Sequence, residues 1–344
     1  MLDDLKYIHQ RDGQDALGIA EKQWQQYIHS FGFEGSSDKP IKHLVIAGMG
    51  GSALAARILP IWPGLSVPIT LVQSYDLPKS ADADSLLICV SYSGNTEETI
   101  SVLEEALKQP EKPAIVVVAS GGKLAELAKD NNLPLVVLPD GYQPRVTLGF
   151  QLRALLEITQ GYSLIQNSLG TLEKAAAYVK DAVVQWRPDN ATKDNPAKKL
   201  AEELAGKSVV VYGGPLMAPI AYKWKINFNE NAKNVAWWNQ YSEFNHNEMI
   251  GWVSQPIEKP YGIVDLRSNL EHPRIQKRFE VTEKLLSGRR PAPNVVQVEG
   301  ETILEQLLWA VAYGDFVSVY LALLNNVNPA PVDLVEKFKL ELDK

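Results

Sequence analysis

Three hydroxyl side chains gather where a predicted strand gives way to a predicted helix. Ser91 and Ser93 follow the apolar run 85–90, and Thr96 precedes an acidic stretch suited to a first helical turn. A helix N-terminus presents unpaired backbone N–H groups and the positive end of the helix dipole, so hydroxyl donors beside it can bind a phosphate without a lysine. The structural alternative, in which Thr96 serves only as the helix N-cap, remains open at this point.

A glycine-rich turn follows an earlier predicted strand, 43–47. Gly50 and Gly51 permit close approach of the backbone to a ligand, and Ser52 places a hydroxyl at the start of the next predicted helix. The dinucleotide-binding fingerprint is incomplete, because Ala53 stands where its third glycine would be and no acidic residue follows near position 72. A nicotinamide enzyme is therefore disfavoured, while a ligand-binding turn and a ligand-free tight turn both remain open.

Candidates for acid–base chemistry lie in the second half of the chain. Glu230 stands between Asn229 and Asn231, whose amides can orient a carboxylate or bind sugar hydroxyls, and it is a candidate general base. His246 is the one histidine of the five that is set in a similar polar cluster, and histidine is the usual side chain for acid–base chemistry near neutral pH. Since an isolated Glu or His is often structural, these roles depend on the rest of the sequence.

The same region argues against a metal site. His246 and Glu248 are two positions apart, with Glu230 and Glu243 nearby, but the helical zinc pattern of two histidines four apart beside a glutamate is absent. Cys89 is the only cysteine, which excludes disulfides within the chain and cysteine-based zinc sites. No metal is expected.

Arg145 lies in a loop after the last predicted strand of the first half of the chain. An exposed arginine most often pairs with surface acids. Its guanidinium also stays protonated and presents a fork of donors, which suits it to stabilise negative charge that develops on a substrate. The place at the carboxyl end of a strand favours the second role.

Short apolar strands that alternate with helices must position these residues. This alternation predicts an α/β fold with a mainly parallel sheet flanked by helices, in which ligands bind at the carboxyl ends of the strands. The predicted strands are 43–47, 85–90, 113–118 and 133–138, and the predicted helices are 52–59, 96–108 and 123–129.

The pattern starts again after a polar stretch at 186–196. The run 208–215 resembles 43–50, since each is an apolar strand that leads into glycines and a helix, and strands at 262–266 and 294–298 flank a helix at 273–286. We therefore expect an internal duplication with two similar domains. The expected boundaries are 1–160 for the first domain, 161–196 for a connecting helix and linker, and 197–344 for the second domain.

Composition limits the classes of function. The 344 residues are 45% apolar and 22% charged, which is typical of a soluble globular protein. A net charge of −7 argues against nucleic-acid binding. The N-terminus does not resemble a signal peptide, and the apolar stretch 307–324 is interrupted by polar residues, so we expect a buried helix there and a cytoplasmic protein without a membrane span.

Several of these segments together resemble a known family. The turn 91–99 resembles the phosphosugar-binding turn of sugar isomerase (SIS) domains, and the complete set, in order along nearly the whole chain, resembles the bifunctional phosphoglucose/phosphomannose isomerases of archaea and some bacteria. The other motifs are Gly48-Met49-Gly50-Gly51-Ser52, Pro144-Arg145, Asn229-Glu230-Asn231-Ala232-Lys233 and Asn245-His246-Asn247-Glu248.

The resemblance implies two tandem SIS-type domains in a homodimer whose active site is shared between subunits. It also implies interconversion of glucose 6-phosphate, or mannose 6-phosphate, with fructose 6-phosphate, without a metal or nucleotide cofactor. Through the matching motifs, a phosphate group of the substrate would be bound by Ser52, Ser91, Ser93 and Thr96.

The resemblance also implies the catalytic roles. Glu230 would move the proton between C1 and C2, Arg145 would stabilise the enediolate, and His246, from the partner subunit, would open the sugar ring. Lys339 lies where the family carries a C-terminal active-site lysine, although Lys337 is two positions away and points to a different helix face.

Two other functions compete with the isomerase. A non-catalytic sugar-phosphate-binding SIS protein would keep the hydroxyl turn but would not need the set of Glu, His and Arg. A glutaminase-linked hexosamine-phosphate synthase would need an N-terminal nucleophilic cysteine, whereas Cys89 lies inside a predicted strand.

Overall fold

The computed structural model describes residues 1–37, 39–254 and 260–342. These residues form two compact units: a first unit, Gln23–Ala177, and a second unit made of Met1–Lys22 and Tyr178–Lys344. The first 22 residues, which the expected boundaries place in the first domain, thus belong to the second unit. They are tied there by Tyr7, whose hydroxyl donates to the Leu323 carbonyl at 2.7 Å, and by Arg11, whose Nε donates to Asn326 Oδ1 at 2.6 Å.

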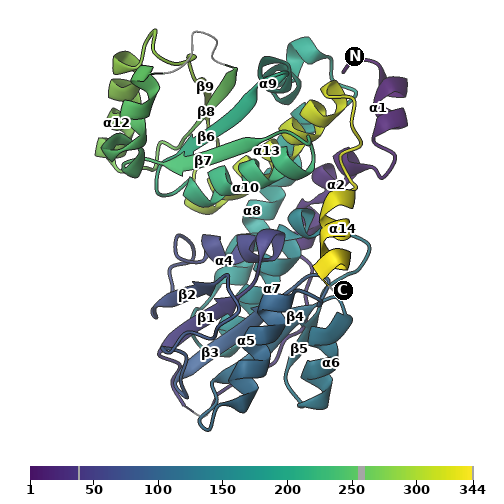
Figure 1. Cartoon of the computed structure of the whole chain (residues 1–344), viewed down its shortest axis with the longest axis vertical. Coiled ribbons are helices and arrows are strands. Elements are labelled where there is room, and N and C mark those ends of the chain that lie inside the picture. Colours follow the sequence, from purple (N-terminus) through teal and green to yellow (C-terminus); the bar gives the residue numbers. More distant parts are fainter. Residues whose placement is uncertain (38, 255–259, 343–344) are drawn as a thin grey trace. The chain divides into compact units, whose positions relative to one another are not determined.

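The first unit is built on a five-stranded sheet in which every adjacent pair of strands is parallel (Figure 1). The strand order is β2-β1-β3-β4-β5. The strands are β1 (His43–Ala47), β2 (Ile69–Val72), β3 (Ser85–Val90), β4 (Ala114–Ala119) and β5 (Leu135–Val137). The helices are α3 (Trp24–Tyr27), α4 (Leu54–Ile58), α5 (Glu97–Lys108), α6 (Gly122–Asp130), α7 (Leu148–Gly161) and α8 (Ser168–Ala182), the last of which continues into the second unit.

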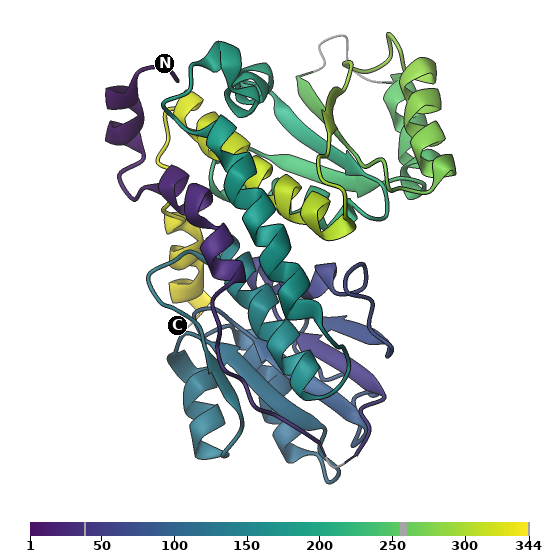
Figure 2. The same ribbon diagram turned by 180° about the vertical axis from the view of Figure 1, so that it is seen from behind.

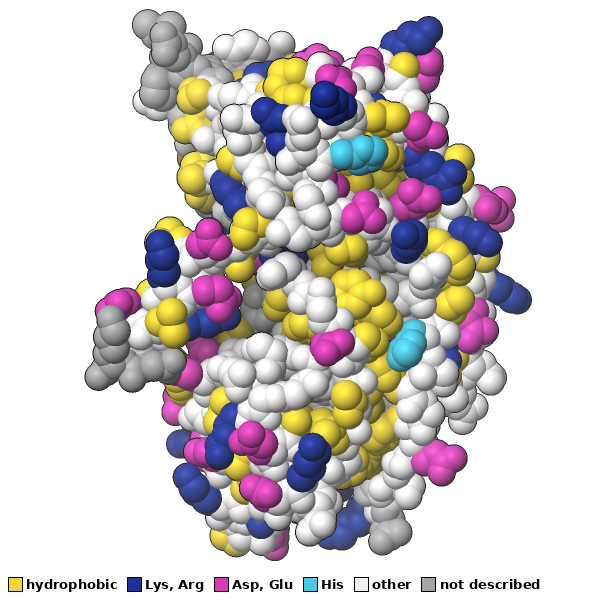
Figure 3. Space-filling model, turned by 90° about the vertical axis from the view of Figure 1, so that its right-hand side faces the viewer, with side chains coloured by type: hydrophobic (Ala, Val, Ile, Leu, Met, Phe, Trp, Pro, Cys, Tyr) yellow, Lys and Arg dark blue, Asp and Glu magenta, His cyan; other side chains and the backbone are white. Residues whose placement is uncertain are grey.

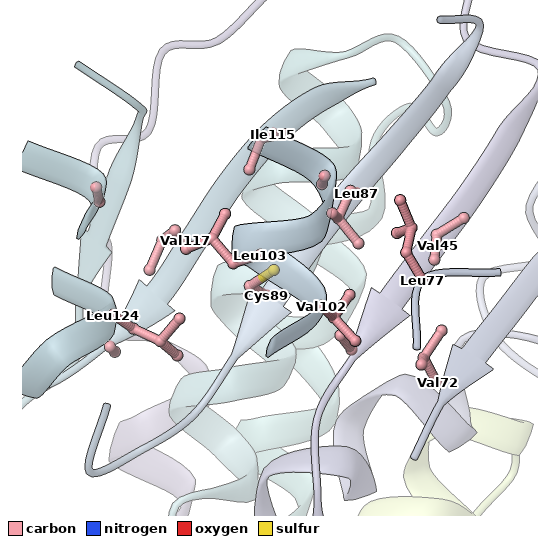
Figure 4. Packing of buried hydrophobic residues seen from close by; sticks show 14 residues of the cluster. Val45, Val72, Leu77, Leu87, Cys89, Val102, Leu103, Ile115, Val117 and Leu124 are labelled. Atoms are coloured by element: carbon pink, nitrogen blue, oxygen red, sulfur yellow. The ribbon is translucent and has the colours of Figure 1, made fainter. Parts of the chain in front are cut away.

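Helices cover both faces of this sheet, which is why its central strands are apolar throughout (Figures 1 and 2). On one face, Val102 and Leu103 of α5 and Leu124 of α6 pack against alternate strand residues (Figure 4). Cys89 lies in this cluster, fully buried, and burial raises the pKa of its thiol to about 12. The cysteine is therefore a core residue without nucleophilic character.

The second unit contains a four-stranded parallel sheet with the order β7-β6-β8-β9. Its strands are β6 (Ser208–Gly213), β7 (Ala236–Gln240), β8 (Tyr261–Arg267) and β9 (Asn294–Gln297). Its helices are α1 (Leu5–Arg11), α2 (Ala16–Lys22), α9 (Pro196–Leu204), α10 (Ala218–Glu230), α11 (Glu248–Gly251), α12 (Pro273–Leu285), α13 (Ile303–Leu324) and α14 (Asp333–Leu342).

Helix α13 is apolar on all sides and forms the centre of the second unit. It is long and apolar enough to cross a membrane, but its apolar window is 94% buried within the protein, as predicted for a core helix. Gly314 lets the indole of Trp224 in α10 lie directly on α13, where the indole Nε1 donates to the Ala310 carbonyl at 2.8 Å. A side chain at position 314 would collide with that indole.

The two sheets share one topology, because β2-β1-β3-β4 and β7-β6-β8-β9 have the same order of strands along the chain. This agreement confirms the predicted α/β class and supports the internal duplication. The prediction omitted β2 and β7, which are the edge strands in corresponding positions and are mostly half-exposed. It also began the helix after β1 two residues too early, because Gly50–Ala53 form a 3-10 turn and α4 begins at Leu54.

Charges on the surface are mixed. On the face drawn in Figure 3, Lys and Arg side chains are interspersed with Asp and Glu, and the described residues form no continuous basic stripe there. On this face, positive and negative side chains are therefore neighbours.

Candidate active site

The turn 91–96 after β3, here called the hydroxyl turn, is held by its own side chains. Ser91 is fully buried, and its Oγ lies 2.7 Å from Thr96 Oγ1 and accepts the Gly94 N–H at 3.1 Å. Thr96 is the N-cap residue of α5, but its side chain makes no capping hydrogen bond. The Thr96 hydroxyl therefore does not act as the N-cap of α5. It faces Ser91 instead and helps to hold the turn in shape before a ligand binds.

Ser93 lies on the open side of the same turn. Its side chain is exposed, and its Oγ accepts the Asn95 N–H at 3.3 Å. An accepting hydroxyl still has its own proton to donate. The Ser93 hydroxyl can therefore donate its proton to a ligand without breaking the bond that it accepts. Ser91, in contrast, is fixed in the turn.

A second loop, which the sequence analysis did not select, buttresses the hydroxyl turn. Gly94 has φ +72°, and a side chain there would overlap the Gly121 carbonyl oxygen in the loop after β4. Asn95 Oδ1 accepts the Lys123 N–H at 3.0 Å, and the Gly94 carbonyl accepts the Leu124 N–H at 2.9 Å. The signal was present, because residues 120–122 are Ser-Gly-Gly and, like the two turns already described, follow the carboxyl end of a strand.

The turn 48–52 after β1, here called the glycine turn, lies beside the hydroxyl turn. Ser52 is buried, and its Oγ accepts the Tyr92 N–H at 3.0 Å. Gly50 has φ +49° and open space where a side chain would be, so it keeps the expected capacity for close approach. A Cβ on Gly51 would lie 2.7 Å from the Arg145 backbone nitrogen, so the absence of a side chain at Gly51 lets the backbone of the Arg145 turn pack closely against it.

Arg145 belongs to the same edge of the first sheet. It sits in the 3-10 turn Pro144–Val146, is only 2% exposed, and is fixed by the contact of its backbone with Gly51. The next residue is anchored as well, since Gln26 Nε2 donates to the Val146 carbonyl at 2.8 Å. The first unit thus brings together Arg145 and all the residues predicted to bind phosphate, namely Ser52, Ser91, Ser93 and Thr96.

Glu230 is the last residue of α10 in the second unit and is half-buried. Lys233 Nζ donates to the Glu230 carbonyl at 2.6 Å and so closes the helix end. Two nearby asparagines face α13: Asn227 donates to Asp315 Oδ1 at 2.5 Å and Asn231 to Ser318 Oγ at 2.9 Å. These amides anchor the helix that carries Glu230 to α13.

His246 ends the 3-10 turn Glu243–His246 and is exposed, but its neighbours are fixed. Phe244 is buried with Tyr212, Tyr241 and Phe279 in an aromatic cluster on one face of the second sheet. Asn245 Nδ2 donates to Thr282 Oγ1 in α12 at 2.8 Å. Glu248 accepts from the Tyr212 hydroxyl and from Asn239 Nδ2. The imidazole is therefore presented to the outside from a rigid segment.

Glu230 and His246 lie on opposite faces of the second sheet. Helix α10 packs on the face with α13, where Tyr222 meets Trp238 with ring centroids 5.5 Å apart. The His246 segment packs on the other face through Phe244, whose ring centroid is 4.8 Å from that of Tyr212. The sheet itself therefore separates the candidate base from the candidate ring-opening residue within one chain.

Lys339 projects from α14, whose described side chains are all partly or fully exposed. Its Nζ lies 2.9 Å from Glu336 Oε1 in an exposed ion pair. Lys337 is exposed on the same helix. The choice of Lys339 over Lys337 thus stays a prediction.

The loop after β8 corresponds in topology to the hydroxyl turn after β3. Here Glu271, which is 4% exposed, accepts the Leu216 N–H at 2.8 Å from the loop after β6. Burial raises the pKa of the Glu271 carboxyl. In the second unit, the Glu271 carboxylate thus accepts from a backbone N–H at the strand ends, a position that suits an anion.

Among the described residues, no three His, Cys, Asp or Glu side chains gather into a group that could hold a metal ion. The polar groups described above are hydroxyls, amides, carboxylates and the buried Arg145 guanidinium. These groups suit binding of a phosphate ester and proton transfer.

Known structures match the fold. A glucose-6-phosphate isomerase like protein from Thermus thermophilus superimposes with a TM-score of 0.64, at 19% identity, over 97% of this chain and 99% of its own. Tagatose-6-phosphate ketose/aldose isomerase from Escherichia coli gives a TM-score of 0.62, at 15% identity, over 94% of this chain and 90% of its own. At these identities the likeness concerns the fold alone.

Sequence relatives extend the match to the family. Residues 193–342 match the model for the bacterial phospho-glucose isomerase C-terminal SIS domain. A D-glucosamine-6-phosphate 4-epimerase from Sulfolobus acidocaldarius is 33% identical over 63% of this chain and 66% of its own length. The bifunctional phosphoglucose/phosphomannose isomerases of Aquifex aeolicus (strain VF5) and Thermoplasma volcanium are 34% and 35% identical, over 89% and 87% of this chain and 92% and 91% of their own lengths. The chain therefore belongs to the bifunctional phosphoglucose/phosphomannose isomerase family.

Proposed function

We propose that the protein interconverts glucose 6-phosphate and mannose 6-phosphate with fructose 6-phosphate through a cis-enediolate. The observation that carries the proposal is the pre-formed hydroxyl turn at the start of α5, with Ser91 and Thr96 bonded to each other and Arg145 at the same edge of the sheet. A phosphate bound there supplies binding energy remote from the reacting carbons and fixes C1 and C2 in place.

Proton transfer is assigned to Glu230. Its carboxylate takes the C2 proton of either aldose and returns it to C1, while the hydroxyl proton on O2 moves to O1, so that the ketose is an isomer of the aldose. Because both aldoses give the same planar enediolate, one base serves both substrates if the pocket accepts either configuration at C2. The Arg145 guanidinium, which stays charged, stabilises the enediolate oxygens.

His246 is assigned to ring opening in the site of a partner subunit. Supporting this, His246 is exposed on a rigid segment and lies on the opposite face of the second sheet from Glu230. A homodimer with shared sites would let the two residues meet on one substrate although the sheet separates them in one chain. Lys339 is assigned to the same site as a further cation.

The reaction moves two protons within one molecule and exchanges no electrons with another, so we propose that it needs no metal or nucleotide. The test incubates metal-stripped protein with fructose 6-phosphate in deuterated water and follows the products by NMR. Deuterium at C2 of glucose 6-phosphate and mannose 6-phosphate supports the proposal. Unchanged ketose would identify a sugar-phosphate-binding protein, and a product altered at C4 would identify an epimerase.

The matched variant is Glu230→Gln, which keeps the size of the side chain but removes the base. Turnover is expected to fall by about 10²- to 10⁴-fold, with little change in KM. The exposed Glu126→Gln serves as the control for loss of a carboxylate. Normal turnover in Glu230→Gln would exclude Glu230 as the base.

A further inference from the structure

Tyr92 lies between two predicted phosphate ligands, Ser91 and Ser93, but its side chain is directed elsewhere. It is 6% exposed, and its hydroxyl donates to the Pro139 carbonyl at 2.8 Å and accepts the Tyr142 N–H at 2.9 Å. The phenol thus bonds to two points of the loop that follows β5. That loop leads directly into the turn Pro144–Val146, which holds Arg145.

The backbone of Tyr92 is bonded in two other directions. Its N–H donates to Ser52 Oγ at 3.0 Å in the glycine turn. Its carbonyl accepts from Ser120, through the N–H at 2.9 Å and the hydroxyl at 2.6 Å. One residue therefore connects the loops after β1, β4 and β5 to the hydroxyl turn after β3.

We propose that Tyr92 is a positioning residue that sets where Arg145 lies relative to the phosphate-binding turn. The proposal rests on the proposed isomerase function for its catalytic consequence. The Tyr92 hydroxyl joins the phosphate-binding turn to the Arg145 loop directly, and the close packing of Gly51 against the Arg145 backbone joins the glycine turn to the same loop. The phenol is the link that a conservative substitution can remove without touching the backbone.

The chemistry of the phenol suits this role. A neutral phenol donates one hydrogen bond and accepts another at the same time, and burial raises the pKa of Tyr92, so it stays protonated at neutral pH. Phenylalanine fills the same space but leaves the Pro139 carbonyl and the Tyr142 N–H without this partner. Displacements of about 1 Å in a catalytic group cost around 100-fold in rate.

Tyr92→Phe is therefore expected to lower kcat by about 10- to 100-fold. Competitive inhibition by inorganic phosphate is expected to stay unchanged, because Ser91, Thr96 and the Tyr92 backbone remain in place. The control is Tyr162→Phe, a buried tyrosine of the same unit that stacks on Phe33 with ring centroids 6.4 Å apart. Unchanged kcat in Tyr92→Phe, or weaker phosphate inhibition that parallels the loss of kcat, would overturn the proposal.

A double-mutant cycle tests whether Tyr92 acts through Arg145. If it does, adding Tyr92→Phe to Arg145→Ala causes no further loss of kcat. Fully additive losses would show that Tyr92 acts independently of Arg145 and would reject the positioning role. Both variants are compared with wild type by thermal unfolding, and assays are run well below the lowest melting temperature.

A readout that does not depend on catalysis separates this proposal from the proposed function. Amide hydrogen exchange at Tyr142 is expected to rise in Tyr92→Phe, while exchange in the core strand β3 stays as in wild type. If the wild-type protein proves inactive, the isomerase assignment is refuted. The exchange at Tyr142 still decides whether Tyr92 holds the Arg145 loop, because it does not depend on catalysis. Unchanged exchange at Tyr142 would refute the link between Tyr92 and the Arg145 loop.

Discussion

Glu230 and His246 are held on opposite faces of one four-stranded sheet. Helix α10 carries Glu230 on the face shared with α13, and Phe244 anchors the His246 segment in the aromatic cluster on the other face. Neither position is free to migrate, because Asn231 ties the end of α10 to Ser318 and Asn245 is bonded to Thr282. The proposed sharing of an active site between two copies of the chain has a direct kinetic consequence.

Glu230→Gln and His246→Ala are each expected to be nearly inactive alone but to complement each other when mixed under subunit exchange. A hybrid dimer would have one site with both native residues and one site with neither. With random pairing, about a quarter of the wild-type activity should return. The mixture is assayed before and after exchange, and failure to recover activity in verified hybrids would place both residues in the same chain's site.

Ser91 and Ser93 are expected to respond differently to alanine. Ser93 is exposed and has one weak internal bond, so Ser93→Ala should raise KM for the sugar phosphate without changing the melting temperature. Ser91 is fully buried and bonds to Thr96 and Gly94, so Ser91→Ala should raise KM and also lower the free energy of unfolding by about 1–3 kcal/mol. Equal effects on stability would contradict this division of roles.

Gly94→Ala is expected to destabilise the first unit strongly. The residue has φ +72°, and a methyl group would overlap the Gly121 carbonyl, so strain and overpacking together cost about 3 kcal/mol. Gly170→Ala in α8 is the matched control, because a methyl group there meets nothing within 4 Å and alanine favours helix. Urea unfolding should show opposite signs for the two variants.

The stability of the protein should depend on pH through Glu271. Burial raises the pKa of its carboxyl above the ordinary value of 4.5. The folded state then holds the proton to higher pH than the unfolded chain, so the contribution to stability is complete below about 4.5 and is lost as pH rises through the folded pKa. Relative to wild type, Glu271→Gln should therefore gain stability between pH 4.5 and neutrality.

Urea unfolding of Glu271→Gln and wild type across this pH range tests the sign. The exposed Glu299→Gln is the control for the loss of a surface carboxylate. If the stability of Glu271→Gln relative to wild type does not change with pH, the carboxyl does not titrate differently in the folded state. If the variant loses stability relative to wild type as pH rises, the assignment is reversed.

Cys89 is expected to report global unfolding. It is fully buried in β3, and burial raises its pKa to about 12, so the reactive thiolate is scarce. A thiol reagent should label it in denaturant and leave it unlabelled in buffer at neutral pH. Fast labelling of the native protein would show that the strand opens locally.

The sequence predicted the features that depend on neighbouring residues. The strand, hydroxyls and helix around Ser91 and Thr96 are consecutive, so their arrangement follows from local preferences. The packing of Arg145 against Gly51 and the bonds of the Tyr92 hydroxyl join segments far apart in the chain. The sequence pattern carries no information on such pairs until the strand order is known.

The same reason explains two further features that the sequence pattern did not reveal. Strand β7 lies within a polar, aromatic stretch that resembles a site more than a strand, and its pairing with β6 makes it part of the sheet. Asparagines in and beside a predicted helix suggested partners such as a carboxylate or sugar hydroxyls, because helix interiors seldom contain asparagine. The partners of Asn227 and Asn231 are Asp315 and Ser318 on α13, nearly 90 positions away in the chain, and the sequence pattern does not identify them.

The repeated strand order gives the hydroxyl turn a counterpart in the second unit. In the first unit, the loop after the third strand of the sheet offers the hydroxyls that we propose bind the substrate phosphate. In the second unit, Glu271 in the corresponding loop supplies a carboxylate to the Leu216 N–H. The second copy of the scaffold thus satisfies a backbone donor at its strand ends with a side chain of its own.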